Sequence, residues 1–131
     1  SACLAGIPCR YDGRSSPNPE VMALLKAGKA IPVCPEQLGG LATPREPMEL
    51  SGGRAKTSKG NDYTEQLKRG SEATAQLAKL VGATEAILRE NSPSCGVEKI
   101  YDGTFSGTLC PGEGLCTKRL RELGLKVRGS R

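Results

Sequence analysis

Stretches with helical periodicity alternate along this chain with short apolar runs. The strongest periodicity spans residues 62–82, where small or apolar side chains recur on one face. A second helix is predicted at residues 18–28, because Asn18 can cap it and Pro19 suits its first turn. A third helix is predicted at residues 115–124, where apolar side chains recur every third or fourth position.

The apolar runs between these helices are typical of buried strands. Residues 30–33, 86–88 and 125–127 are the predicted strands, and residues 1–4 have the character of a strand tail whose beginning lies upstream. Glycine and proline punctuate residues 41–61, so we expect a loop there with a short strand near Met48. Strands that alternate with helices form mostly parallel sheets with helices on both faces.

The length of 131 residues is that of one domain, with room for a single hydrophobic core. We therefore expect residues 1–131 to form a single α/β domain, a three-layer Rossmann-like fold with a mostly parallel sheet.

The absence of histidine limits the chemistry of the chain most. No Ser-His or Cys-His catalytic pair and no zinc site with imidazole ligands can form, so acid-base catalysis must use other side chains. Six cysteines are many for a cytoplasmic protein, which is the location that we expect. Metal or redox chemistry is the better interpretation, because the predicted α/β core needs no disulfides.

Charge and composition limit the classes of binding partner that we expect. Lysine and arginine outnumber aspartate and glutamate by 19 to 14, a moderate excess that attracts anions but is too small for a dedicated nucleic-acid clamp. Aromatic residues make up 3% of the chain, so we expect no base-stacking platform and no DNA partner. No apolar run approaches the length of about 20 residues that spans a membrane, so no membrane partner is expected either.

Three of the cysteines follow predicted strands. Ligands of open α/β sheets bind beside the carboxyl ends of the strands, and Cys3, Cys34 and Cys95 are expected there, each near a turn-forming residue. Three thiolates suit zinc or an iron-sulfur cluster and leave one coordination position for substrate. Cys9 is a rival for Cys3 as a ligand. The alternative interpretation is that these cysteines are small buried residues of the core.

The remaining polar and cysteine candidates have ordinary structural interpretations. Cys116 lies on the apolar face of a predicted helix and is expected in the core, and Cys110 is expected in a loop. Taken alone, Glu36 is explained as a carboxylate that caps the next turn, and Ser92 as a turn residue before proline.

Four segments nevertheless resemble one family in sequence and in order. SACLAGIPCRYDG, IPVCPEQLGGLATPR, RENSPSCG and YDGTFSG cover most of the chain and are similar to the TudS-like thiouracil desulfidase family. The resemblance implies a 4Fe-4S cluster that three cysteines hold, Cys3, Cys34 and Cys95, with one iron left open. It also implies that Glu36 and Ser92 form the catalytic pair.

The activity implied by the resemblance is the non-redox desulfuration of 4-thiouracil or 2-thiouracil to uracil and hydrosulfide. The open iron would act as a Lewis acid on the thiocarbonyl sulfur, while Glu36 activates water and Ser92 positions it. Gly39, Gly40 and Gly96 are expected to let the backbone approach the cluster and donate N–H groups to its sulfurs.

Two other functions remain as alternatives. A structural metal in a binding module for thiolated RNA would use the positive charge, and a desulfidase could act on thiolated tRNA nucleosides, although the short chain favours a small-molecule substrate. Thiol–disulfide exchange is disfavoured, because the chain has no C-x-x-C motif.

Overall fold

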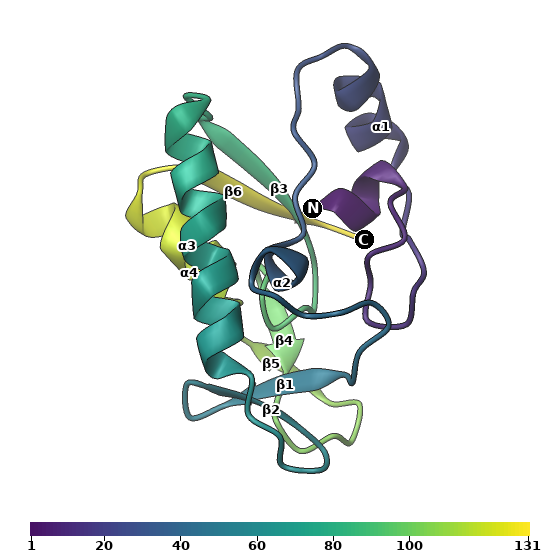
Figure 1. The fold of residues 1–131 in the computed structure, drawn as a ribbon, viewed down its shortest axis with the longest axis vertical. Coiled ribbons are helices and arrows are strands. Elements are labelled where there is room, and N and C mark those ends of the chain that lie inside the picture. Colours follow the sequence, from purple (N-terminus) through teal and green to yellow (C-terminus); the bar gives the residue numbers. More distant parts are fainter.

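A computed structural model describes residues 1–131, and its helices and strands alternate along the chain (Figure 1). They are, in order, a 3₁₀ helix η1 (Ala2–Ala5), α1 (Pro19–Lys26), α2 (Pro35–Leu38), β1 (Met48–Ser51), β2 (Arg54–Thr57), α3 (Thr64–Leu80), β3 (Glu85–Arg89), β4 (Lys99–Tyr101), β5 (Leu109–Pro111), α4 (Leu115–Glu122) and β6 (Lys126–Ser130). None of the helices has both the length and the apolar character needed to cross a membrane.

The three helices predicted from periodicity are confirmed as α1, α3 and α4. The predicted cap of α1 also forms, because the Asn18 side chain accepts a hydrogen bond of 3.1 Å from the Val21 N–H. Helix α3 buries its small residues against its neighbours, and α4 packs beside it. Caps and apolar periodicity thus predicted the helices correctly because both signals are local in the sequence.

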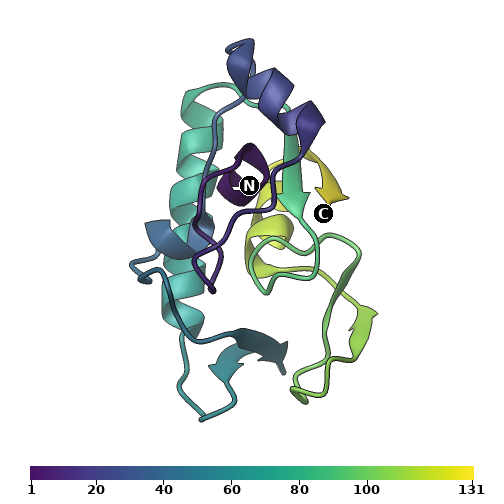
Figure 2. The same ribbon diagram turned by 90° about the vertical axis from the view of Figure 1, so that its right-hand side faces the viewer.

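The strands form three separate pairs. Strands β3 and β6 pair in parallel, with Glu85 opposite Lys126, whereas β1–β2 and β4–β5 are antiparallel. Helices α3 and α4 lie on one side of the β3–β6 pair, and η1 and α1 lie on the other (Figure 1). Both antiparallel pairs lie at the end of the molecule away from α1 (Figures 1 and 2). The mixed α/β class is therefore confirmed, but the expected mostly parallel sheet does not form, since two of the three strand pairs are antiparallel and the three pairs are not joined into one sheet.

Two predicted strands do not form. Residues 30–33 lie in no strand, because Pro32 has no N–H to donate to a ladder and no strand pairs with this segment. The opening of the chain forms η1 instead of a strand tail, and Gly6 ends this helix in the left-handed conformation with φ of 91°. Ser1 precedes η1 and lies along β3, where its ammonium donates to the Ile87 carbonyl at 2.8 Å.

The core explains two of the three glycines that we expected near a cluster. A Cβ at Gly39 would lie 2.0 Å from the Gln66 carbonyl oxygen, so this glycine lets α2 and α3 touch. A Cβ at Gly96 would meet Ile100 at 2.7 Å. The N–H groups of Gly39, Gly40 and Gly96 all donate to backbone carbonyls, so the expectation that they serve cluster sulfurs is wrong.

Candidate functional site

One cavity of about 420 Å³ brings together the residues that the sequence singled out. The side chains predicted for the site all line it: Cys3, Cys9, Cys34, Glu36, Ser92 and Cys95. They come from η1 and the turn after it, from the start of α2, and from the loop after β3. A volume of this size is typical of small-molecule sites, which range from about 300 to 1,000 Å³.

Backbone contacts bring Cys3 and Cys34 to the same part of the cavity. The Ala2 N–H donates to the Val33 carbonyl at 2.7 Å, which holds η1 against the residues that precede Cys34. Cys34 immediately precedes α2, where Pro35 occupies the first helical position. The structure therefore places Cys34 at the beginning of a helix, and not at the end of a strand as the sequence predicted.

Cys9 is the third member of this thiol group. It is buried and packs with Cys3 and Cys34. Hydrogen bonding among the three thiols lowers the pKa of Cys3 and of Cys34 and, together with burial, raises the pKa of Cys9. The backbone amide of Gln37 lowers the pKa of Cys34 further, as does the positive charge of Arg45. The Cys34 sulfur also lies 3.8 Å from the Cys9 carbonyl oxygen.

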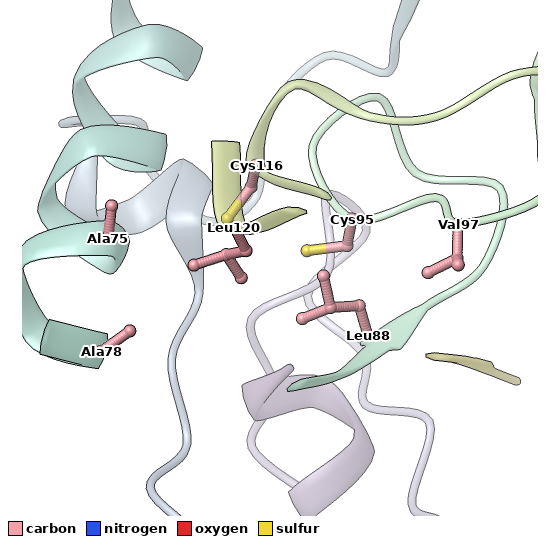
Figure 3. Packing of buried hydrophobic residues seen from close by; sticks show 7 residues of the cluster. All are labelled: Ala75, Ala78, Leu88, Cys95, Val97, Cys116 and Leu120. Atoms are coloured by element: carbon pink, nitrogen blue, oxygen red, sulfur yellow. The ribbon is translucent and has the colours of Figure 1, made fainter. Parts of the chain in front are cut away.

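Cys95 approaches the cavity from the loop between β3 and β4. Its side chain packs with Leu88, Cys116 and Leu120 (Figure 3), and burial raises the pKa of its thiol. Helix α4 binds this loop, since the Thr117 hydroxyl donates a hydrogen bond of 3.1 Å to the Cys95 carbonyl.

Ser92 begins the same loop and organises it. Its Oγ accepts from the backbone N–H groups of Ser94 and Cys95, at 3.1 and 3.0 Å. An oxygen that accepts two N–H groups keeps its own proton for donation elsewhere. Ser92 is therefore both the turn residue that we expected and a donor available to the cavity.

Glu36 is held by a buried cation. The Arg45 Nε lies 2.9 Å from Glu36 Oε1, and the two side chains are 8% and 11% exposed. The guanidinium also donates to the carbonyls of Cys9 and Ala42 and to the Thr43 hydroxyl. Arg45 thus holds the Glu36 carboxylate and the Cys9 turn together. The second carboxylate oxygen, Glu36 Oε2, makes no hydrogen bond within the chain.

We expect Arg45→Lys to lower the free energy of unfolding by about 1–2 kcal/mol. The lysine ammonium cannot reproduce the several directed hydrogen bonds that the planar guanidinium of Arg45 donates. Urea denaturation of the variant and of the wild type measures this difference. The control is Arg54→Lys, which alters the exposed pair of Arg54 with Asp62 and should change the midpoint little. Equal changes in the two variants would show that Arg45 has no special structural role.

The donor set suits a multi-atom cluster better than a single ion. No three His, Cys, Asp or Glu side chains converge closely enough to hold one metal ion. Four thiols nevertheless surround the cavity, and thiolates are the usual ligands of iron-sulfur clusters, whose iron atoms lie apart from one another. Cys116 is fully buried in the core, as predicted, and Cys110 lies in β5 and not in a loop; neither lines the cavity.

Sequence reasoning missed several residues of the cavity. Arg45 lies in one of the four segments that resemble the family, but the sequence gives no sign of its role, because only the fold shows that it pairs with Glu36. Asn91, Tyr11, Tyr101 and Phe105 were missed as well. The signal available for the aromatic residues was their rarity, since the chain has three tyrosines, one phenylalanine and no tryptophan.

Comparison with known proteins identifies the family. The family model for 2-thiouracil desulfurase matches residues 1–130. The chain is 42% identical to the uncharacterized protein YbbK of Bacillus subtilis (strain 168), over 97% of this chain and 91% of that protein. A solved structure, the [4Fe-4S]-dependent thiouracil desulfidase TudS, is 43% identical with a TM-score of 0.95, over 99% of this chain and 87% of that one. The chain therefore belongs to the 2-thiouracil desulfurase family, whose members are enzymes that act on C–S bonds.

Proposed function

We propose that this protein removes sulfur from thiolated uracil, 4-thiouracil or 2-thiouracil, with the help of a 4Fe-4S cluster. The observation that carries the proposal is the gathering of four thiols, Glu36 and Ser92 around one cavity of small-molecule size. The similarity to TudS, which is described as [4Fe-4S]-dependent, supports the choice of cofactor.

Cys3, Cys34 and Cys95 are the proposed ligands of the cluster. They belong to three separate segments of the chain, so they approach the cavity from different directions, as ligands of several iron atoms must. Cys9 packs with both Cys3 and Cys34, so its thiol would remain beside these ligands as a hydrogen-bond donor. Three protein ligands leave one iron open.

The residues of the cavity can then carry out a hydrolysis. When bound, the cluster supplies an open iron that acts as a Lewis acid on the thiocarbonyl sulfur. Glu36 Oε2, which Arg45 leaves free, accepts a proton from the water that attacks the ring carbon. Ser92 donates its hydroxyl proton to orient that water. A C–O bond forms, the C–S bond breaks, and sulfur leaves as hydrosulfide without a change of oxidation state.

The test of this function uses protein reconstituted with iron and sulfide under anaerobic conditions. We expect about four irons and four sulfides per chain and the release of uracil and sulfide from 4-thiouracil. Protein treated with a chelator is the control and should release neither. Stoichiometric zinc without sulfide would exclude the cluster. Fully loaded protein that releases no sulfide from thiolated bases, nucleosides or tRNA would exclude the activity.

A further inference from the structure

Two residues of the cavity have a backbone conformation that L-amino acids avoid. Asn91 and Phe105, with φ of 69° and 57°, are the non-glycine residues of the chain with positive φ. They lie in different loops, after β3 and between β4 and β5, and both line the cavity that holds the thiols. Such conformations persist where the surrounding structure enforces them, and they gather at functional sites.

The amide of Asn91 has no partner within the chain. Its Oδ1 is buried and makes no hydrogen bond, and its amide nitrogen donates to no protein group. Asn91 forms a parallel β-bridge with Ile100, and the turn at Ser92-Pro93 follows it directly. A buried acceptor without a partner is costly to the protein, so this amide is available to a ligand.

Phe105 lines the cavity and is partly exposed to solvent. It is the chain's single phenylalanine, yet 37% of it is exposed. The N–H groups of Gly103 and Phe105 donate to Glu49 Oε1 at 3.0 and 3.1 Å, which fixes the loop to β1. Tyr11 and Tyr101 line the same cavity, so three of the four aromatic residues of the chain are there. Aromatic side chains fixed at a cavity provide faces on which a flat ring can stack.

We propose that Asn91 and Phe105 form the recognition site for the substrate ring, an inference that rests on the proposed function. The amide offers a donor beside an acceptor, which matches a ring N3–H next to a carbonyl oxygen. In 4-thiouracil and in 2-thiouracil N3–H has an oxygen on one side and the sulfur on the other. Pairing with N3–H and the oxygen leaves the sulfur free in either isomer. Phe105 supplies a stacking face for the ring.

The test measures binding of the product ring to cluster-loaded protein by calorimetry. Wild type should bind uracil at least about tenfold more tightly than 3-methyluracil, which lacks the N3–H. Asn91→Gly keeps the positive φ and removes the amide. The preference of this variant for uracil over 3-methyluracil should therefore fall below about threefold. Asn91→Asp keeps the acceptor for the N3–H but loses the donor to the ring oxygen that both ligands share, so it should bind both rings more weakly and keep the preference for uracil. This variant serves if the glycine variant does not fold. Asn61→Gly, outside the cavity, is the control and should retain the wild-type preference.

Phe105→Leu should weaken binding of both uracil and 3-methyluracil, each by about tenfold, because it removes the stacking face and leaves the polar edge intact. Tyr63→Leu changes the one aromatic residue outside the cavity and should leave both dissociation constants unchanged. Equal affinities of wild type for the two ligands, or an undiminished preference in Asn91→Gly, would overturn the inference.

The outcomes separate this inference from the proposed function. Loaded wild type that releases sulfide from 4-thiouracil but does not discriminate between uracil and 3-methyluracil overturns the recognition site alone. Loaded wild type that discriminates between the two rings but releases no sulfide overturns the proposed function and supports the recognition site.

Discussion

Cys34→Ser protein is expected to carry no stable cluster after anaerobic reconstitution and to release no sulfide from 4-thiouracil. Serine offers an alcohol oxygen where iron prefers a thiolate, and Cys34 lies beside two other thiols at the start of α2. Iron and sulfide analysis with the visible absorption spectrum measures the cluster. The matched control is Cys110→Ser in β5, outside the cavity, which should load as wild type does.

The same measurement decides between Cys3 and Cys9. Cys3→Ser and Cys95→Ser should lose the cluster as Cys34→Ser does. Cys9→Ser keeps a hydroxyl that can still donate to the neighbouring sulfurs, so most of its cluster should remain. Full loading of Cys3→Ser together with loss in Cys9→Ser would show that Cys9 is the first ligand.

The elements that the sequence predicted correctly are those whose signals are local. Helices α1 and α3 have caps or periodic apolar faces, and the apolar run at residues 86–88 lies within β3. The errors came from short apolar runs, for which a strand needs a partner that no local signal reveals. Residues 30–33 have no partner strand, and the opening residues turn into η1.

The thiols could be found in the sequence because their chemistry identifies them, whereas the roles of Glu36 and Ser92 were predicted only from the family resemblance. The side chains that complete the cavity could not be found. Arg45 is one of 19 basic residues, and only the fold shows that it is buried against Glu36. Asn91 and Phe105 differ from other loop residues in backbone conformation, which depends on the bridge to Ile100 and on the contacts of Glu49. Low aromatic content excluded a nucleic-acid platform, but it did not exclude a site for one ring.

Glu36→Gln is expected to reduce turnover per cluster by about 100-fold or more, the usual scale for loss of a general base. Glutamine has nearly the same shape, and its amide oxygen can still accept from Arg45, so the cavity and the cluster content should be preserved. The variant cannot take a proton from water at the position of Oε2. Sulfide release from 4-thiouracil, normalised to iron content, measures the effect.

Glu46→Gln is the control for this exchange, since Glu46 is the acidic residue next to Arg45 but lies outside the cavity, and its turnover should match wild type. Ser92→Ala is a weaker test, because it also leaves the N–H groups of Ser94 and Cys95 without their acceptor and so disturbs a proposed ligand. In Glu36→Gln the carboxylate alone is lost. Undiminished turnover per cluster in that variant would therefore mean that the proton of the attacking water goes to another group, and that Glu36 serves only to anchor Arg45.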